Sequence, residues 1–462
     1  SVLTVILAAL SVGYWYGGRR ADQKHSLDEL FACITIAGLL TLLLLLGIVT
    51  LLPVVSPYFS PTLGPLILSI ALFFIPAFLL GIVSPYIIKI QSLNTLPEAI
   101  GGVVGKTFFW GTFGSIVGSI LSGFWLIPTL GVERTILTVS IVLVALGIMI
   151  PIFLNRPLHK KGLLYVCLLA IVLGTSVLVA NKVRMGSSVY QAEGIYSSIT
   201  ITDVEIYGQY ARLLNRDTNN SSAIFLRNTN LVFDYAQFAY IYKYLKPETT
   251  SMLMLGGGAY TIPRTLVTID PTIEIDVVEI EPVLYELAQE YFDLTDTTRI
   301  TNYPEDARTY LLDTNKKYDV IFADLFSTNL AAPFHLTTYE YYSLVREHLT
   351  DDGIFIMNYV GKPKVPAPSL TGSVAKTIKT VFPNMRMFGL DPSHKTKRQN
   401  IMFIATKDDR PLDLSGITLP SARLGEIVPE TMEIDLDTYS FKDEYLLTDD
   451  YAPVDRLMAK QW

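Results

Sequence analysis

The sequence predicts a protein in two parts: an apolar, multi-pass α-helical membrane domain, then a soluble part with a small antiparallel β-domain and an α/β domain. Half of the 462 residues are hydrophobic and only 17% are charged, whereas soluble proteins carry about 25% charged residues. Residues 185–462 hold most of the charges, so residues 1–180 are strongly apolar. Three consecutive glycines at 256–258 stand between a strand-like run and a helix-like run, as in nucleotide-binding α/β domains.

Residues 1–180 contain apolar segments of the length that spans a bilayer. About six are present, at residues 2–16, 30–54, 63–90, 103–128, 134–154 and 163–180. We therefore expect an integral protein of the cell membrane, with the lipid bilayer as a partner. Glycine and serine recur from Gly111 to Gly123 at small-xxx-small spacing, which favours helix contacts there. Since no Asp, Glu or Arg stands mid-helix, an anchor is favoured over a transporter.

The soluble part is expected to begin after a linker at residues 181–192. Residues 193–250 read as a small β-domain, because apolar and polar residues alternate from Tyr196 to Asp203 as in a half-buried strand. Further strands are predicted at residues 210–214 and 223–226, and an aromatic-rich helix over 233–245.

The α/β domain is predicted over residues 251–462. A strand at 252–255, the glycines Gly256, Gly257 and Gly258, and the helix-like run after them make the opening unit of a nucleotide-binding sheet. Glycine is needed there because a Cβ would block the close approach of backbone to ligand. Further strands are predicted near residues 275–280, 300–302, 318–324, 353–358, 386–388 and 400–405.

Three acidic residues, Glu279, Asp306 and Asp324, follow strands of this predicted sheet. Ligands of such sheets bind beyond the carboxyl ends of the strands, where a carboxylate like Glu279 accepts both ribose hydroxyls. Asp306 can accept from an adenine amino group or cap the next helix. Asp324 follows apolar residues, and partial burial would make it a proton acceptor. This order of glycine turn and acids indicates an S-adenosyl ligand better than a dinucleotide.

The soluble part resembles the spermidine synthases, which are polyamine aminopropyltransferases. The resemblance extends from about Glu193 to Arg456. It rests on Glu193-x-x-Tyr196, Leu255-Gly-Gly-Gly258, Val278-Glu-Ile-Glu-Pro282, Glu305-Asp-Ala-Arg308, Tyr318-Asp-Val-Ile-Phe-Ala-Asp324 and His335-Leu-Thr-Thr-Tyr-Glu-Tyr-Tyr342. Gly17-Gly-Arg-Arg-Ala-Asp22 and Thr448-Asp-Asp-Tyr-Ala-Pro-Val454 look like the membrane-fused branch of that family.

The resemblance implies a Rossmann-like fold of the class I methyltransferase type and a β-domain that often mediates oligomerisation, such as a homodimer. It implies polyamine biosynthesis without a metal: an aminopropyl group passes from decarboxylated S-adenosylmethionine to a small amine. Asp324 matches the family's catalytic acid, which takes the amine's proton. Glu279 matches the ribose ligand and Asp306 the adenine ligand. Tyr240 and Tyr341 match aromatic positions that shape the amine pocket.

Two departures from the family's pattern concern the amine. Ala259 and Tyr260 replace an Asp-Gly pair whose Asp holds an ammonium group, and Ser327, a further candidate for substrate binding, replaces a second Asp. A polyamine needs carboxylates to replace its water, so both changes weaken polyamine binding. The acceptor is therefore left open. Alternatives are a methyltransferase that uses intact S-adenosylmethionine on a membrane-proximal acceptor, a non-catalytic protein that keeps the fold and, more weakly, a polyamine transporter.

The charges in the sequence indicate which partners are excluded and on which side of the membrane the soluble part lies. The net charge of −7 argues against a nucleic-acid partner. Positive residues gather in the first, third and fifth loops between predicted helices, which the positive-inside rule places in the cytoplasm. With six spans the soluble part would lie outside, a side that suits the sequons at residues 219–222. An S-adenosyl cofactor is made in the cytoplasm, so the sequence leaves the side of the membrane open.

Overall fold

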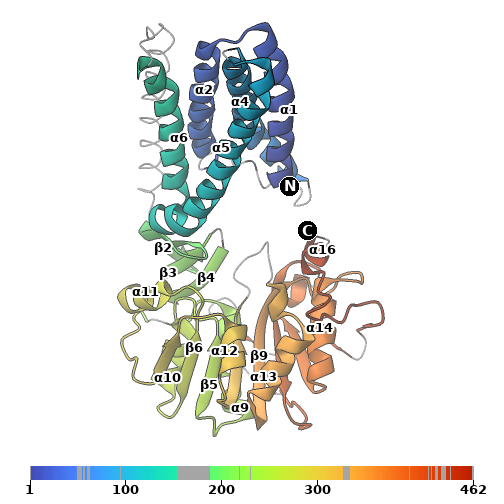
Figure 1. Ribbon diagram of the computed structural model, residues 1–462. Coiled ribbons are helices and arrows are strands. Elements are labelled where there is room, and N and C mark those ends of the chain that lie inside the picture. Colours follow the sequence, from blue (N-terminus) through green and yellow to red (C-terminus); the bar gives the residue numbers. More distant parts are fainter. Residues whose placement is uncertain are drawn as a thin grey trace. The chain divides into compact units, whose positions relative to one another are not determined.

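The computed structural model divides the chain into two compact units, Ser1–Gly186 and Ser187–Trp462 (Figure 1). It describes residues 2–48, 55, 58–59, 63–93, 95–153, 188–217, 219–228, 230–325, 333–394, 396–414, 416–417, 419–421, 425–427, 433–436 and 439–459. The predicted sixth apolar segment (163–180) and Ser327 lie outside the described residues.

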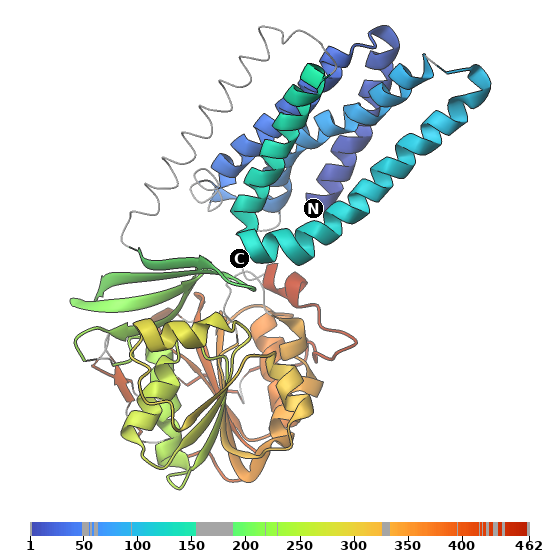
Figure 2. The ribbon, with the colours of Figure 1, turned by 60° about the vertical axis from the view of Figure 1, so that its left-hand side comes forward.

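The first unit is helical, as predicted, and a helix lies in each of the first five apolar segments over the residues described. These are α1 (Val2–Gln23), α2 (Leu27–Leu46), α4 (Gly64–Ser92), α5 (Ile100–Leu121) and α6 (Ile127–Phe153), with a 3-10 turn, η3 (Pro97–Ala99), before α5. A π-helical turn, η4 (Ser122–Leu126), lies where the chain reverses between α5 and α6 (Figure 2), and Gly131 inside α6 has non-helical backbone angles.

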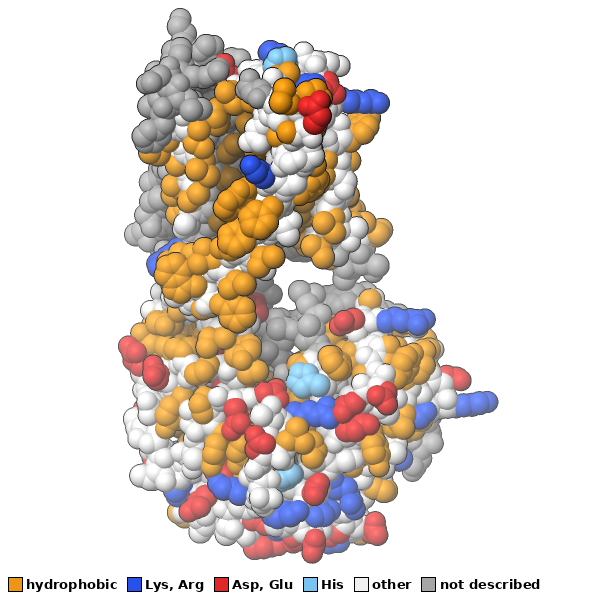
Figure 3. All heavy atoms as spheres, in the orientation of Figure 1, with side chains coloured by type: hydrophobic (Ala, Val, Ile, Leu, Met, Phe, Trp, Pro, Cys, Tyr) orange, Lys and Arg blue, Asp and Glu red, His pale blue; other side chains and the backbone are white. Residues whose placement is uncertain are grey.

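Three helical stretches among the described residues are long and apolar enough to cross a membrane. They are Leu27–Leu46, Gly64–Ser92 and Pro97–Ile150, the last of which contains α5 and most of α6. The first predicted segment, now α1, is not one of them. The face of this unit seen in Figure 3 is mostly hydrophobic, as expected of side chains that meet lipid.

Glycines bring these helices together, but not those that the sequence singles out. A Cβ on Gly13 of α1 would lie 2.3 Å from the Phe78 carbonyl oxygen of α4, and one on Gly147 of α6 would lie 2.1 Å from Thr35 Oγ1 of α2. Within the described residues no buried residue is found on α5, so the helix contacts expected of the Gly111–Gly123 stretch stay a prediction. Spacing alone did not tell a packed glycine from an exposed one.

The second unit begins with a four-stranded antiparallel sheet in the order β1-β2-β3-β4. Its strands are β1 (Ser188–Glu193), β2 (Ser198–Ile206), β3 (Gln209–Arg216) and β4 (Asn219–Phe225). Strand β1 falls within the predicted linker. Ile199, Ile201 and Leu214 of this sheet pack against α11 (Val283–Tyr291), which joins the sheet to the α/β core.

The α/β core is a seven-stranded mixed sheet in the order β10-β11-β9-β8-β5-β6-β7, and the predicted Rossmann-like fold class is confirmed. The strands are β5 (Ser251–Leu255), β6 (Glu274–Val278), β7 (Ile300–Tyr303), β8 (Tyr318–Ala323), β9 (Leu349–Gly361), β10 (Met385–Gly389) and β11 (Gln399–Thr406). Strands β5 to β9 pair in parallel, and β10 and β11 extend the sheet antiparallel. The strand order reverses between β5 and β8, where such folds bind ligands.

Helices cover both faces of this sheet (Figures 1 and 2). On one face lie α12 (Ala307–Asp313), α13 (Tyr339–Glu347), α14 (Leu370–Val381) and α16 (Val454–Ala459). On the other lie α8 (Asp234–Gln237), η5 (Phe238–Ile241), α9 (Tyr242–Leu245) and α10 (Thr261–Ile269). The remaining short elements are η6 (Phe334–Leu336), η7 (Pro392–His394), β12 (Leu419–Ser421) and β13 (Gly425–Ile427).

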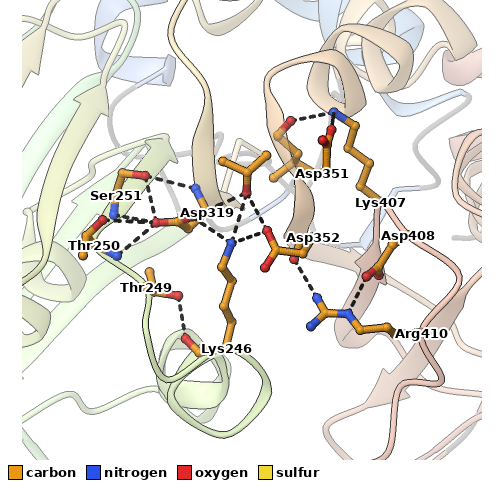
Figure 4. A network of polar contacts seen from close by, with 12 residues as sticks. Lys246, Thr249, Thr250, Ser251, Asp319, Asp351, Asp352, Lys407, Asp408 and Arg410 are labelled. Carbon is orange, nitrogen blue, oxygen red and sulfur yellow. Dashed lines mark hydrogen bonds and ion pairs between the residues drawn. The ribbon is translucent and has the colours of Figure 1, made fainter.

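A buried ion network joins the starts of three central strands, at the end of the sheet away from the glycine loop (Figure 4). Lys246 Nζ lies 2.8 Å from Asp319 of β8 and 2.6 Å from Asp352 of β9. Asp319 Oδ2 also accepts hydrogen bonds from the backbone N–H groups of Thr250 and Ser251, at 3.0 and 3.1 Å. The network therefore fixes the register in which β5, β8 and β9 reach the opposite edge.

Candidate functional site

The glycine loop leaves β5 in a conformation that favours glycine. Gly256 has φ +92° and Gly258 has φ +53°, values at which a side chain is strained. A Cβ on Gly256 would also lie 2.2 Å from the backbone oxygen of Asp324. The glycines thus allow the loop to pass close to the end of β8, which brings Asp324 beside the loop.

Glu279, just beyond the end of β6, is bound to that loop. Its Oε2 accepts hydrogen bonds from the N–H groups of Gly257 and Gly258, both at 2.9 Å, and its Oε1 accepts from the N–H of Glu281 at 3.0 Å. The residue is only 3% exposed. Its carboxylate lies at the carboxyl edge of the sheet, where a ribose ligand is expected.

Asp324, just after β8, is held from the neighbouring strand. Asn358 of β9 donates from Nδ2 to Asp324 Oδ1 at 2.9 Å, and Asn400 of β11 donates to Asn358 Oδ1 at 2.9 Å. Burial raises the pKa of Asp324 to about 6, although the hydrogen bond from Asn358 opposes the shift. A carboxylate whose pKa lies near neutrality can take and return a proton.

These groups surround one small cavity of about 60 Å³. Its described lining comes from the β-domain, the glycine loop and the ends of the central strands: Arg216, Asn220, Ser221, Ser222, Tyr235, Gly258, Glu279, Asp324, Asn358, Val360 and Asn400. Ligand pockets usually have volumes of about 300–1,000 Å³. The described cavity therefore offers room for a small polar group and is smaller than a nucleoside requires.

A larger cavity, of about 450 Å³, lies elsewhere in the unit. Its lining includes Lys364, Glu433, Asp435, Tyr439 and Glu444. Glu444 is already engaged, since it accepts hydrogen bonds from the N–H and the hydroxyl of Ser369, the N-cap of α14. None of the predicted site residues lies in its described lining, so we place the site at the smaller cavity.

The structure brings together three of the predicted site residues, Gly258, Glu279 and Asp324, in that smaller cavity. Asp306 follows β7 at the same edge of the sheet and caps α12, because its Oδ1 accepts from the N–H groups of Arg308 and Thr309. Its Oδ2 lies 3.4 Å from His335 Nε2.

The two predicted tyrosines are not among the described residues that line this cavity. Tyr341 is fully buried against Tyr342 in the core beneath α13. Tyr240 packs against the core on the other face of the sheet. Tyr235, from the same aromatic stretch, reaches the cavity, and its hydroxyl donates to the Ser221 carbonyl oxygen at 2.9 Å.

Much of the lining was missed from sequence because it comes from strands far apart in the chain. Arg216 and Ser222 belong to the β-domain, and Ser222 Oγ accepts the N–H of Ala259 at 3.1 Å. From the sequence, Asn220 was assigned to an N-glycosylation sequon, but the structure places it in the lining of the cavity. An isolated asparagine in an apolar strand, such as Asn358 in FIMNYV, was the one available signal.

No group of three or more His, Cys, Asp or Glu side chains that could hold a metal occurs among the described residues. The acids of the cavity accept hydrogen bonds from backbone N–H groups and from the Asn358 amide.

Comparison with known proteins shows which family this domain is similar to. Residues 237–409 match the family model described as the spermine/spermidine synthase domain. The matched residues include the glycine loop, Glu279, Asp324 and both asparagines that position Asp324.

Three curated relatives show what the chain is similar to. A probable polyamine aminopropyl transferase of Bifidobacterium longum is 29% identical over 216 residues, which are 46% of this chain and 46% of that protein. Polyamine aminopropyltransferase 1 of Streptomyces coelicolor is 26% identical over 321 residues, 65% of this chain and 59% of that protein. An N-terminal histidine N-methyltransferase of Emericella nidulans is 37% identical over 144 residues, 30% of this chain and 24% of that protein.

The coverage of these matches shows which parts of the chain they include. Each covers less than two thirds of the relative's own length. The Streptomyces match covers more of this chain than Ser187–Trp462 contains, so it extends into the helical unit. Among solved structures, a probable spermidine synthase from Corynebacterium glutamicum matches with a TM-score of 0.42 at 23% identity, over 48% of this chain and 81% of that one.

Proposed function

We propose that this protein is a membrane-anchored transferase that moves an alkyl chain from the sulfonium of an S-adenosyl cofactor to an amine. The observation that carries the proposal is the single cavity shared by Gly258, Glu279 and Asp324, in a unit that matches the family model of the spermine/spermidine synthase domain. Glu279 would exchange its loop contacts for the ribose hydroxyls. Asp306 Oδ2, the oxygen that does not cap α12, would accept a hydrogen bond from the adenine amino group.

The reaction follows from the position of Asp324. The amine nitrogen attacks the methylene carbon next to the sulfonium, an N–C bond forms, and the S–C bond breaks. Methylthioadenosine leaves with the electron pair of that bond, and the nitrogen's proton passes to Asp324. With a pKa of about 6, this carboxylate is mostly ionised at neutral pH and can accept the proton.

The family's usual form of this reaction transfers an aminopropyl group to a polyamine precursor, and the Bifidobacterium and Streptomyces relatives carry that name. We leave the acceptor as a small amine, because Ala259 and Ser327 stand at two acidic positions of the family's pattern. A homodimer formed through the β-domain and contact with the bilayer belong to the same proposal. Methyl transfer is the second candidate, favoured by the name of the Emericella relative.

The test measures methylthioadenosine released by the full chain in detergent, supplied with decarboxylated S-adenosylmethionine or S-adenosylmethionine and with putrescine or a monoamine. We expect release with at least one pair, falling about 100-fold or more in Asp324→Asn. The rate should rise with pH through about 6, as Asp324 loses its proton. Asp293→Asn, which removes an exposed acid outside the cavity, is the control. Release of S-adenosylhomocysteine instead would favour methyl transfer, and an unchanged Asp324→Asn rate would overturn the role of Asp324.

A further inference from the structure

A buried arginine lines the candidate site, beside the two acids. Arg216, the last residue of β3, is 7% exposed and belongs to the described lining of the cavity that holds Glu279 and Asp324. Its Nε donates to Ser197 Oγ at 3.2 Å, which directs the guanidinium from the β-domain into the cavity. A buried cation is unexpected in a site for a polyamine, because like charges repel strongly where water is excluded.

Arg216 is not needed to satisfy Glu279. The Glu279 carboxylate already accepts three backbone N–H groups, from Gly257, Gly258 and Glu281. The ion pair between Arg216 Nη1 and Glu279 Oε1 is 3.5 Å long, longer than the 2.7–2.9 Å of a charge-assisted hydrogen bond. The planar donor fork of the guanidinium is therefore not matched to Glu279 in the two-bond geometry that arginine forms with carboxylates.

Other groups of the cavity can also take part in binding a carboxylate. The hydroxyls of Ser221 and Ser222 line the cavity with Arg216. The carboxylates of Glu279 and Asp324 lie there too, but they are held by backbone N–H groups and by Asn358. Ala259 carries no charge where the resemblance expects an acid that holds an ammonium group, and its N–H is bound to Ser222 Oγ. One ammonium-binding group is thus missing and one carboxylate-binding group is present.

We propose that Arg216 binds the α-carboxylate of intact S-adenosylmethionine, so that the cofactor of this site is the carboxylated form. Decarboxylated S-adenosylmethionine ends in an ammonium group alone and would place it near the guanidinium. The inference rests on the proposed nucleoside site and names the form of the cofactor that it takes. The chain transferred to the amine would then carry the carboxylate, and the thioether left behind would still be methylthioadenosine.

The test is titration calorimetry on the full chain in detergent micelles with three ligands: S-adenosylmethionine, decarboxylated S-adenosylmethionine and methylthioadenosine. We expect S-adenosylmethionine to bind about 10- to 100-fold more tightly than the decarboxylated form, the range of one or two charge-assisted hydrogen bonds. In Arg216→Gln this preference should fall to about one, while methylthioadenosine affinity changes less than about threefold. Arg216→Lys keeps the positive charge but loses the planar set of donors. Its preference for S-adenosylmethionine should therefore lie between that of the unaltered chain and that of Arg216→Gln.

The matched control is Arg212→Gln on the same strand, because Arg212 pairs with Asp203 outside the described lining of the cavity. Equal or tighter binding of the decarboxylated form by the unaltered chain would overturn the inference, whatever the variants do. So would an equal loss of all three ligands in folded Arg216→Gln, since Arg216 would then act only through Glu279. If methylthioadenosine itself does not bind the folded chain, the proposed function fails and the inference falls with it.

Discussion

Asp324 is the residue whose surroundings bear most directly on chemistry. Burial raises its pKa to about 6, while the hydrogen bond from Asn358 opposes that shift. The folded protein therefore binds a proton on Asp324 between about pH 4 and pH 6, where an unfolded chain does not. Stability falls as the pH rises through that window, because the folded state must then hold a buried charge.

This linkage gives a prediction for Asp324→Asn. Below pH 4 Asp324 is protonated in both states, so the variant should match the parent. Above pH 6 the variant should be more stable, by up to about 3 kcal/mol for a shift of roughly two pK units. Thermal unfolding of both proteins in detergent at pH 4 and pH 7.5 measures the difference, with Asp293→Asn as the control. A gap that does not grow with pH would contradict the raised pKa.

Among the residues of the site, the sequence predicted those that directly follow a parallel strand. It missed those that other strands and the β-domain bring to the site. Glu279 and Asp324 follow β6 and β8, and adjacent parallel strands must bring their carboxyl ends together. Asn358 lies on β9, the parallel neighbour of β8, while Asn400 and Ser222 reach the site through an antiparallel pairing and a separate small sheet. Those registers depend on packing that no local pattern encodes.

At the scale of elements, the sheet holds the site from the opposite end. Lys246 is 4% exposed and joins the starts of β8 and β9 through Asp319 and Asp352. Burial tends to raise the pKa of Asp319, but Lys246 and two backbone N–H groups outweigh it and lower the value to about 2. The network stabilises the unit without touching the cavity.

We therefore expect Lys246→Met to destabilise the α/β unit at neutral pH by about 1–3 kcal/mol, since it leaves the partly buried Asp319 and the more exposed Asp352 without their cation. Lys243→Met, one turn earlier on α9, should have a small effect because Lys243 is 37% exposed. Denaturant unfolding followed by far-ultraviolet circular dichroism measures the free energy of unfolding of both variants. Equal stabilities for the two variants would show that the network is not a structural clamp.

The seven strands lie close to their predicted positions because each is a short apolar run bounded by polar residues. The stretch 233–245 is less simple: it forms three short helical pieces, α8, η5 and α9. The predicted helical conformation is confirmed, and the three pieces place Tyr235 at the cavity while Tyr240 packs in the core. Tertiary packing decided which aromatic residue faces the site.

At the scale of the whole molecule, a helical unit with three candidate membrane spans is joined in one chain to the α/β unit. Apolar helices of this length cross a bilayer because their backbone groups are satisfied internally. We expect the expressed protein to stay in membrane pellets after alkaline carbonate extraction and to be released by detergent. Recovery in the carbonate supernatant would contradict membrane spanning.

The positive-inside rule places the α/β unit outside the cell, whereas the cytoplasmic synthesis of the cofactor places it inside. Protease treatment of intact cells, followed by detection of residues 188–459, gives the answer. Protection of this unit in intact cells and its loss after permeabilisation would place it with the cytoplasmic cofactor. Cleavage in intact cells would place it outside, as the loop charges indicate, and would weaken the enzymatic proposal.

The central claim, an S-adenosyl nucleoside site built on Glu279, is tested most directly by calorimetric binding of methylthioadenosine to the full chain in detergent. We predict binding with a dissociation constant of about 1–100 μM, lost in Glu279→Gln and kept in Glu274→Gln, which changes an exposed acid at the far end of β6. Binding that Glu279→Gln leaves unchanged, or no binding by a folded sample, would contradict the account and leave the fold without its proposed cofactor.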